Sequence, residues 1–158
     1  MARPPDSPGR RTADTLPPSM RDRVPFLLFR ASAVSLALAN QMLAPLALNA
    51  RQAGILTMVT EREPMTQKDL SAALGIDRTS MVTLLDDLEE KRYAARQRHP
   101  HDRRAFLIHP TENGRRAKAA AVRILDEQQR QFLAPLTAAE RDQLAALLKR
   151  LLGQPEAP

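Results

Sequence analysis

The sequence predicts a mainly α fold that carries a small β-wing. Aromatic residues make up only 3% of the 158 residues and Trp is absent, whereas an all-β domain usually needs more aromatic and β-branched side chains. Two short helical patterns meet at the tripeptide Leu74-Gly75-Ile76. A basic segment with the pattern of a β-hairpin follows these helices directly. This order of elements is typical of a winged helix-turn-helix flanked by further helices.

The two helices of the central pair are expected at Gln67–Leu74 and Arg78–Lys91. Thr66 and Asp77 stand immediately before them, and both residue types accept hydrogen bonds from the first backbone N–H groups of a helix. Gly75 follows the first helix and suits the left-handed conformation that ends many helices. The second helix has apolar residues at the helical spacing i, i+3, i+4 and i+7, namely Met81, Leu84, Leu85 and Leu88.

Two short antiparallel strands are expected at Tyr93–Gln97 and Arg104–His109, joined by a turn-rich loop. Positive charge is concentrated here, because Asp102 is the only acid between residues 91 and 104. The basic residues are Lys91, Arg92, Arg96, Arg98, Arg103 and Arg104. We interpret the hairpin as a basic wing, and the alternative is a solvated basic loop.

Long apolar helices are expected on both sides of this central lobe. The segment Pro25–Leu43 is apolar around most of its circumference, so it has to be buried on most sides. Helices are also expected at Ala50–Thr60, at Glu112–Leu133 and from Thr137 to about Leu152. The small lobe cannot cover the terminal helices fully, whereas a homodimer that interleaves them would do so.

The chain is therefore expected to divide into five parts. Residues 1–22 are rich in Pro and Arg and are expected to form a disordered basic arm. Residues 23–48 are expected to form an N-terminal dimerisation helix, and residues 49–111 the winged helix-turn-helix lobe. Residues 112–153 are expected to form the C-terminal dimerisation helices, and residues 154–158 a tail.

The composition favours a polyanionic partner and argues against several other classes of protein. A net charge of +6 and a pI of about 10.7 suit nucleic acid or an acidic surface. The absence of Cys excludes disulfides and thiolate metal sites. His99, His101 and His109 lack the further ligands of a metal site, so no metal is expected. The sequence also lacks a catalytic cluster and a glycine-rich phosphate loop, so we expect no enzyme activity and no cofactor.

One apolar segment resembles a signal peptide or a membrane span, but its context argues against both. Residues 24–39 are largely apolar, yet Arg30 interrupts them and they lie far from the N-terminus. Extension of the segment toward Leu48 meets Asn40, Gln41 and Pro45. We therefore expect a cytoplasmic protein with no membrane partner.

The helix Arg78–Lys91 is expected to lie in the major groove of double-stranded DNA, with its N-terminal residues nearest the bases. Arg78 can donate two hydrogen bonds to a guanine edge, and Thr79, Ser80 and Thr83 can contact bases or phosphates. The alternative for Thr79 and Ser80 is a supporting role at the N-terminus of the helix. The acidic second half of the helix is expected to point away from DNA, because carboxylates repel phosphate.

The wing is expected to enter the minor groove, whose negative potential attracts arginine. Arg103 and Arg104 would make this contact, and Asp102 would orient a neighbouring arginine through a salt bridge. Arg96 and Arg98 would meet DNA phosphates.

A small-molecule site on the first long helix is a further hypothesis. Arg30 is the lone cation of this helix and has Phe26, Phe29 and Ser32 near it in the sequence. An arginine in a mostly apolar cleft can pair with the carboxylate of a ligand. The alternative is a salt bridge to an acid within the chain or in a second subunit, because buried charges are usually paired.

The chain resembles the MarR family of bacterial transcriptional regulators over about residues 24–152. The resemblance is carried by Leu70–Val82, by Leu88-Glu89-Glu90-Lys91, by the wing sequence Pro100–Arg104 and by Thr111–Gly114. Similarity to this family implies a homodimer joined through its terminal helices and bound to a pseudo-palindromic operator. For many members it also implies repression that ends when a small phenolic or lipophilic anion enters the cleft between the dimer helices and the DNA-binding lobe.

Some positions depart from the family pattern. Arg92 stands where many members have glycine, so a non-glycine residue has to take a turn that costs about 1 kcal/mol if its φ is positive. Thr83 and Asp87 stand where many members carry a basic residue, and Pro110 replaces an apolar strand residue. These departures concern the affinity and geometry of operator binding, and not the fold.

The function expected from these observations is that of a homodimeric, sequence-specific DNA-binding transcriptional regulator. We expect a repressor that a small aromatic or lipophilic ligand releases from DNA. The alternative is a winged-helix interaction protein that binds a protein partner without reading an operator, which Arg92 and the missing basic residues would favour. Steep salt dependence of DNA binding would count against this alternative, because phosphate contacts release counterions.

Overall fold

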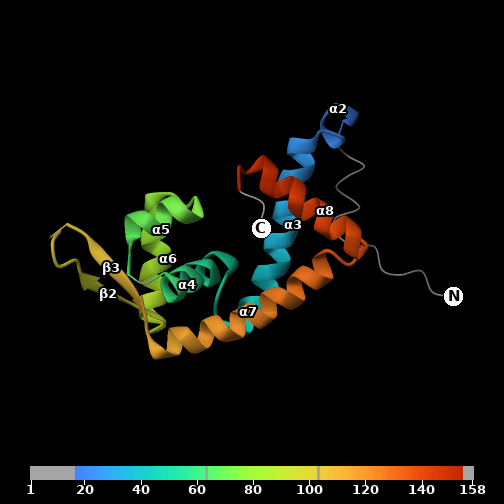
Figure 1. The fold of residues 1–158 in the computed structure, drawn as a ribbon. Coiled ribbons are helices and arrows are strands. Elements are labelled where there is room, and N and C mark those ends of the chain that lie inside the picture. Colours follow the sequence, from blue (N-terminus) through green and yellow to red (C-terminus); the bar gives the residue numbers. More distant parts are fainter. Residues whose placement is uncertain (1–16, 63, 103, 155–158) are drawn as a thin grey trace.

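The computed structural model describes residues 17–62, 64–102 and 104–154. A compact lobe with a projecting hairpin lies at one end of a long helix, and two further helices lie at the other end (Figure 1). In chain order the elements are α2 (Pro18–Arg21), α3 (Val24–Leu43), the short 3-10 helix η1 (Ala44–Leu46), α4 (Ala50–Glu61), β1 (Met65–Thr66), α5 (Gln67–Leu74), α6 (Arg78–Glu90), β2 (Ala94–Arg98), β3 (Phe106–Pro110), α7 (Glu112–Phe132) and α8 (Ala138–Leu151). The mainly α fold with a small wing is confirmed.

Each helix from α4 to α8 begins after a residue whose side chain accepts a backbone N–H, and the caps expected at Thr66 and Asp77 are confirmed. Full capping boxes form at Asn49, Thr66 and Thr137, where the residue three positions later returns a hydrogen bond to the backbone of the cap. Thr111 accepts a hydrogen bond from the backbone N–H of Gly114 at 3.0 Å. Gly75 ends α5 with φ +61°, the left-handed conformation expected of it. Local sequence therefore sets most helix boundaries.

The core of the lobe forms where α4, α5, α6 and the sheet meet. α6 contributes Met81, Leu85 and Leu88, which are fully buried, and α5 contributes Leu70. The α4 and sheet residues of this core are Ile55, Leu56, Val59 and Ile108. Because α6 buries this face, its opposite face is left to solvent.

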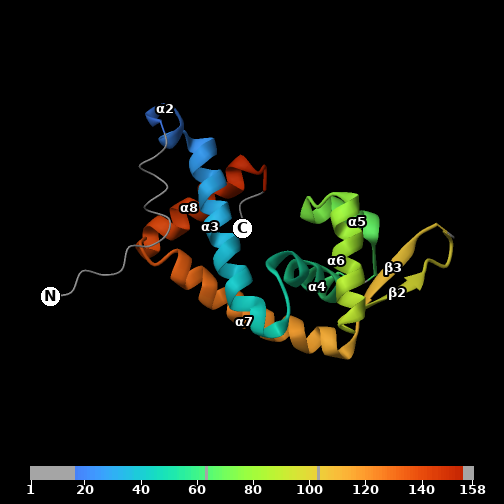
Figure 2. The ribbon, with the colours of Figure 1, turned by 180° about the vertical axis from the view of Figure 1, so that it is seen from behind.

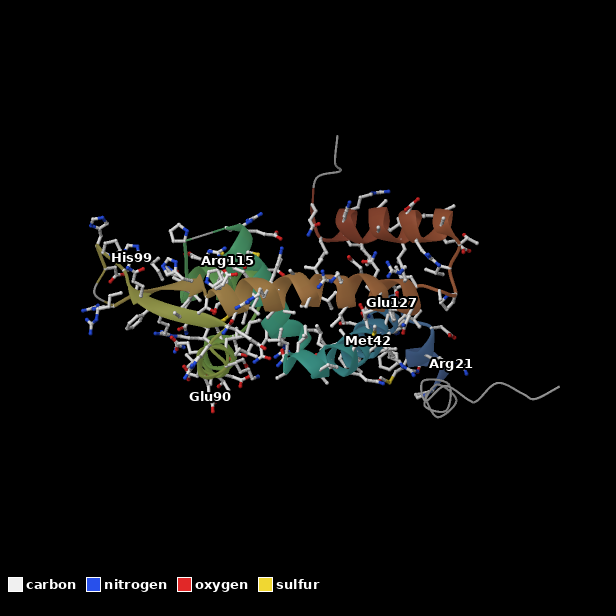
Figure 3. All side chains as sticks on the ribbon, turned by 90° about the horizontal axis from the view of Figure 1, so that it is seen from below. Arg21, Met42, Glu90, His99, Arg115 and Glu127 are labelled. Atoms are coloured by element: carbon white, nitrogen blue, oxygen red, sulfur yellow. The ribbon has the colours of Figure 1, made fainter. Side chains whose placement is uncertain are left out.

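The long helix α7 joins the lobe to the terminal helices, as two opposite views show (Figure 1; Figure 2). It packs against α4 near the lobe and against α3 farther along. Ala117 and Ala121 are buried in this contact. Gln128, also buried, donates hydrogen bonds from Nε2 to the backbone oxygen and the hydroxyl of Ser35 at 3.2 and 3.1 Å. Figure 3 shows Arg115 near the lobe and Glu127 near α3, so that α7 spans both parts.

The terminal helices α3 and α8 expose large apolar side chains. Phe29 is 68% exposed, and Leu151 and Leu152 at the end of α8 are 70% and 71% exposed. Further exposed apolar residues of these two helices are Val24, Leu27, Leu28, Val34, Leu36 and Leu147. Apolar surface of this extent marks an interface, because water does not stabilise it. One protomer therefore leaves uncovered the surface that a homodimer is expected to bury.

The segment Val24–Leu46 is long and apolar enough to cross a membrane by length and composition alone. Helices at the core of soluble proteins pass the same test, so this observation is weak evidence. The exposed apolar face of α3 is equally suited to a protein partner, and it gives no reason to place the chain in a membrane.

The sheet has one strand more than the sequence predicts. β1 pairs with β3 through Met65–Ile108 and Thr66–Leu107, which gives the antiparallel order β1-β3-β2. A strand of two residues has no alternating pattern, so its existence depends on β3 and not on local sequence. The hairpin strands also begin later than expected, β2 by one residue and β3 by two, so Arg104 lies in the loop before β3.

Part of the expected basic arm is helical. Pro18–Arg21 form α2, and proline suits the first turn of a helix because its missing N–H has no partner there. This corrects the expectation that residues 1–22 are disordered throughout. Residues 1–16, most of that arm, and residues 155–158 of the tail lie outside the described residues.

Arg92 takes the left-handed turn after α6, with φ +57°. The prediction that a non-glycine residue occupies this turn is confirmed. Its N–H donates to the Glu89 oxygen at 2.9 Å, and its carbonyl accepts the Thr111 hydroxyl at 2.6 Å. These bonds hold the turn in a conformation that is unfavourable for a side chain with a Cβ atom.

Replacing Arg92 with glycine is expected to raise the free energy of unfolding by about 0.5–1 kcal/mol, because the relief of strain exceeds the extra flexibility of the unfolded chain. Gly75→Ala is the matched control. A Cβ at position 75 meets no atom within 4 Å. The free energy of unfolding of Gly75→Ala is therefore expected to fall by about 1 kcal/mol through backbone strain alone. Urea unfolding of both variants checks the pair. A less stable Arg92→Gly variant would show that the turn is not strained.

Candidate nucleic-acid interface

The N-terminal half of α6 presents the polar residues that were expected to read bases. Asp77 caps the helix by accepting the backbone N–H of Ser80 at 2.9 Å. Hydrogen bonding from Ser80 lowers the pKa of Asp77, so the cap is a carboxylate at neutral pH. Arg78, Thr79 and Thr83 are exposed, whereas Ser80 is half-buried. The Thr83 hydroxyl donates to the Thr79 carbonyl at 3.3 Å, so it can also accept a hydrogen bond from a partner.

A cleft of about 580 Å³ joins the start of α6 to the hairpin. Arg78 lines it from α6, and Arg104 and His99 line it from the hairpin loop. Lys68 and Asp69 line it from the beginning of α5. Three cationic side chains from three parts of the chain thus line one depression together with the carboxylates Asp69 and Asp102, so its formal charge stays positive, which suits an anionic ligand.

Two residues of this cleft do not follow from the sequence patterns above. Lys68 is exposed in the first turn of α5, a position at which a cation next to the capping Thr66 could have suggested a phosphate contact. Ser71 lies one turn farther along α5, and its hydroxyl oxygen is buried without a hydrogen-bond partner among the described residues. Asp69 also lines the cleft, but its carboxylate is bonded to the Thr66 hydroxyl at 2.7 Å.

Arg96 does not point into this cleft but toward α6. Its Nη1 lies 2.6 Å from the Asp86 carboxylate and also pairs with Glu89. Its backbone N–H donates to Glu89 Oε1 at 2.9 Å. In the free protein the charge of Arg96 is thus paired within the lobe, and its expected contact with a phosphate stays a prediction. Arg98 is exposed at the end of β2 and makes no ion pair within the described chain.

The end of α6 is connected to the linker that follows α3. Lys91 Nζ donates to the Ala47 carbonyl at 2.7 Å and to the Asp87 carboxylate at 2.6 Å. Buried Gln52 of α4 donates to the same carboxylate. The Lys91 ammonium is the main reason why the pKa of Asp87 lies below its ordinary value. Three of the four acids in the second half of α6 are thus ion-paired within the lobe, and the fourth, Glu90, is exposed.

The tip of the hairpin is organised by hydrogen bonds to backbone groups. The ring nitrogen Nδ1 of His99 accepts the N–H groups of His101 and Asp102 at 3.2 and 3.1 Å. The Asp102 carboxylate accepts the Arg104 N–H at 2.9 Å. Asp102 therefore shapes the loop through the backbone, and its expected salt bridge to a neighbouring arginine stays a prediction. Arg103 lies outside the described residues, and His99 lies at the end of the molecule opposite Arg21 (Figure 3).

The residues expected to bind a small ligand lie on α3, away from this cleft. The rings of Phe26 and Phe29 have centroids 6.4 Å apart, and Arg30 is half-buried. Ser32 and Phe29 are exposed. The cavities found in the lobe and beside α7 are lined by other residues. Within one protomer Phe29 and Ser32 thus lie on the surface, and Phe26 and Arg30 are partly covered.

Metal binding has no support in the described part of the chain. It contains no group of three or more His, Asp or Glu residues close enough to hold a metal ion. His99 and His101 face each other edge to face with ring centroids 6.2 Å apart, but His99 is used to hold the loop.

Comparison with known proteins agrees with this geometry. The family model described as "MarR family" matches residues 48–105, which include α4, the helix-turn-helix and most of the wing. A transcriptional regulator of the MarR family from Rhodococcus sp. RHA1 superposes with a TM-score of 0.78 and 29% identity, over 85% of this chain and 96% of that one. The chain is thus similar to the MarR family in its winged helix-turn-helix and shares the fold of solved MarR structures over most of its length. Its relatives in this family are transcriptional regulators and not enzymes.

Three further relatives bear on what the MarR fold binds. A putative transcriptional regulatory protein for the hcr operon of Thauera aromatica is 37% identical over 101 residues, which are 64% of this chain and 61% of that protein. A mutant MarR from E. coli complexed with operator DNA superposes with a TM-score of 0.75 and 26% identity, over 82% and 94% of the two chains. CouR from Rhodococcus jostii RHA1, bound to p-coumaroyl-CoA, has a TM-score of 0.75 and 26% identity, over 90% and 100%.

Proposed function

We propose that this protein is a homodimeric transcriptional regulator that binds double-stranded DNA in a sequence-specific manner. The observation that carries the proposal is the cleft between α6 and the hairpin, which brings Arg78 and Arg104 to one surface. A helix and a hairpin placed in this way can occupy neighbouring grooves, with a phosphate strand lying between them. The structure of a similar MarR protein with operator DNA supports the same use of the fold.

The residues divide by the chemistry that each can offer DNA. Arg78 is proposed to read a guanine edge in the major groove, with Thr79, Ser80 and Thr83 contacting bases or phosphates. Arg103 and Arg104 are proposed to enter the minor groove, and Arg98 to contact phosphate. Lys68, which lines the same cleft as Arg104, is proposed as a phosphate contact in place of Arg96.

The proposed dimer forms through residues 23–48 and 112–153. Its support is the exposed apolar surface of α3 and α8, which has no cover in one protomer. Two-fold symmetry of the dimer then requires two similar half-sites, so the operator is a pseudo-palindrome. As a DNA-binding regulator, the protein is proposed to act in the cytoplasm.

The proposed sign of regulation is repression, relieved by a small aromatic or lipophilic ligand. The p-coumaroyl-CoA complex of a protein with the same fold supports the ligand class. Phe26, Phe29, Arg30 and Ser32 are proposed as contacts, with the arginine facing the anionic group of the ligand. Because Phe29 and Ser32 lie on the surface of one protomer, the second subunit is proposed to complete the site.

Arg78→Ala is expected to lower affinity for operator DNA by about fivefold to 150-fold, because a bidentate contact to a base contributes roughly 1–3 kcal/mol. Binding to scrambled DNA should change much less. Arg98→Ala is the control, since loss of a phosphate contact weakens both complexes similarly. Fluorescence anisotropy titrations of both variants on both DNAs check this. An equal loss on the two DNAs for Arg78→Ala would contradict base reading.

The proposed function is tested by fluorescence anisotropy of the purified protein with its own upstream intergenic DNA and with scrambled DNA, over a range of salt concentrations. Specific regulators prefer their site by about a thousandfold or more, and their affinity falls steeply with salt. That result is expected here. Equal, weak binding to both DNAs with little salt dependence would instead favour a winged-helix protein with a protein partner.

A further inference from the structure

The wing strand β2 is the outer strand of its sheet. The order β1-β3-β2 leaves one edge of β2 without a neighbouring strand. On its inner edge, β2 pairs with β3 from Ala94–Pro110 to Arg98–Phe106. An edge strand presents unpaired N–H and C=O groups, and it is held less firmly than a central strand. The angle of the hairpin therefore depends on what contacts this outer edge.

The outer edge of β2 is held by α6, the helix proposed to read DNA. The Arg96 N–H donates to Glu89 Oε1 at 2.9 Å, so a side chain of α6 takes a backbone group of the edge strand. The Arg96 guanidinium then turns back to the same helix, where it pairs with Asp86 at 2.6 Å and with Glu89. The Arg96 side chain is only 21% exposed, so this contact is partly shielded from solvent.

This arrangement adds a polar connection between the two elements proposed to read DNA, beyond their shared apolar core. Arg96 lies in the middle of β2, and Asp86 and Glu89 lie one turn apart on α6. The bonds constrain the angle between the helix and the hairpin, because a guanidinium is planar and donates in fixed directions. They also offset part of the negative charge of two carboxylates on the helix, which would otherwise repel phosphate more strongly.

We propose that Arg96 is a positioning residue for DNA recognition, which sets the angle between the wing and α6 without touching DNA. This inference rests on the proposed function, because it assumes that both elements bind one DNA site. Arg78 and Arg104 can reach their grooves together only when that angle is kept. Non-specific binding requires only phosphate contacts, so it tolerates a looser wing.

Arg96→Gln separates this role from phosphate binding, with Arg98→Gln as the matched control on the same strand. Arg96→Gln is expected to weaken specific binding about tenfold or more and to leave scrambled-DNA binding and the slope of log K against log salt nearly unchanged. Arg98→Gln is expected to reduce that slope by about 0.9 and to weaken both complexes. A reduced slope for Arg96→Gln as well would overturn the proposal, because Arg96 would then be a phosphate contact.

A double-mutant cycle tests whether Arg96 acts through the helix. If it does, Arg96→Gln should cause little further loss of specificity in a Glu89→Gln background. Equal losses in both backgrounds would overturn the proposed route through Glu89.

Hydrogen exchange of the free protein tests the contact without DNA. In Arg96→Gln, amides of β2 and β3 should exchange faster while those of α4 stay protected. Unchanged exchange in the hairpin would overturn the proposal. If the wild-type protein shows no specific DNA binding, the proposed function fails, and faster exchange in the hairpin would still support the structural contact.

Discussion

Replacing Gly114 with alanine is expected to destabilise the protein by at least about 2 kcal/mol. A Cβ atom at this position would lie 1.9 Å from the Tyr93 carbonyl oxygen and 2.9 Å from its carbon. These are backbone atoms and cannot move as a side chain can, and the same oxygen accepts the Thr111 N–H at 3.1 Å. Overpacking typically costs about 1–3 kcal/mol and sometimes more, which exceeds the roughly 1 kcal/mol that alanine gains over glycine in a helix.

Gly54→Ala is the matched control for this prediction. Gly54 also lies within a helix, but a Cβ there meets Leu74 Cδ2 at an ordinary 3.8 Å. This variant is expected to be as stable as the wild type, or more stable by up to about 1 kcal/mol. Urea unfolding followed by circular dichroism measures both. Similar free energies of unfolding for the two variants would contradict the close contact between Gly114 of α7 and the Tyr93 carbonyl at the base of the wing.

Placing glutamate at both Leu151 and Leu152 is expected to convert the proposed dimer into a folded monomer of 17.6 kDa. Both side chains are exposed in one protomer, so the substitutions should not disturb its core. In an interface they would bury carboxylates, at an effective cost of several kcal/mol per ion. Light scattering measures the mass. DNA affinity should also fall strongly, because a monomer contacts only one half-site.

Lys149→Glu controls for charge in this experiment. It lies on the same helix, is exposed, and changes the net charge by the same amount while leaving the apolar surface intact. It is expected to remain dimeric. A wild-type protein that is already monomeric at micromolar concentration, or a double variant that remains dimeric, would contradict the proposed role of α8.

The features predictable from the sequence are those encoded by neighbouring residues. Thr66 and Thr137 begin their helices because hydroxyl and carboxylate partners stand three residues apart, a spacing that can be read directly. Gly75 and Arg92 take left-handed turns at positions fixed by the end of the preceding helix. The exposed face of α6 follows equally from the spacing of Met81, Leu85 and Leu88.

The features that could not be predicted depend on contacts across the fold. β1 exists only because β3 lies beside it. Arg96 meets Asp86 and Glu89 because the turn after α6 brings β2 back along that helix. A count of charges in the sequence cannot distinguish such an ion-paired arginine from a free one. Lys68 joins Arg104 only through the folding of the hairpin toward α5. The closeness of Gly114 to Tyr93 likewise requires the packing of α7.

The most direct test of the central claim is selection of binding sites from a pool of random DNA duplexes by the purified full-length protein. We expect enrichment of an inverted repeat whose half-site centres lie about one helical turn, roughly 10–10.5 base pairs, apart. The same selection with Arg78→Ala should lose preference at one position in each half-site. Enrichment of no sequence, or of a single unrepeated site, would contradict a dimer that reads an operator through α6.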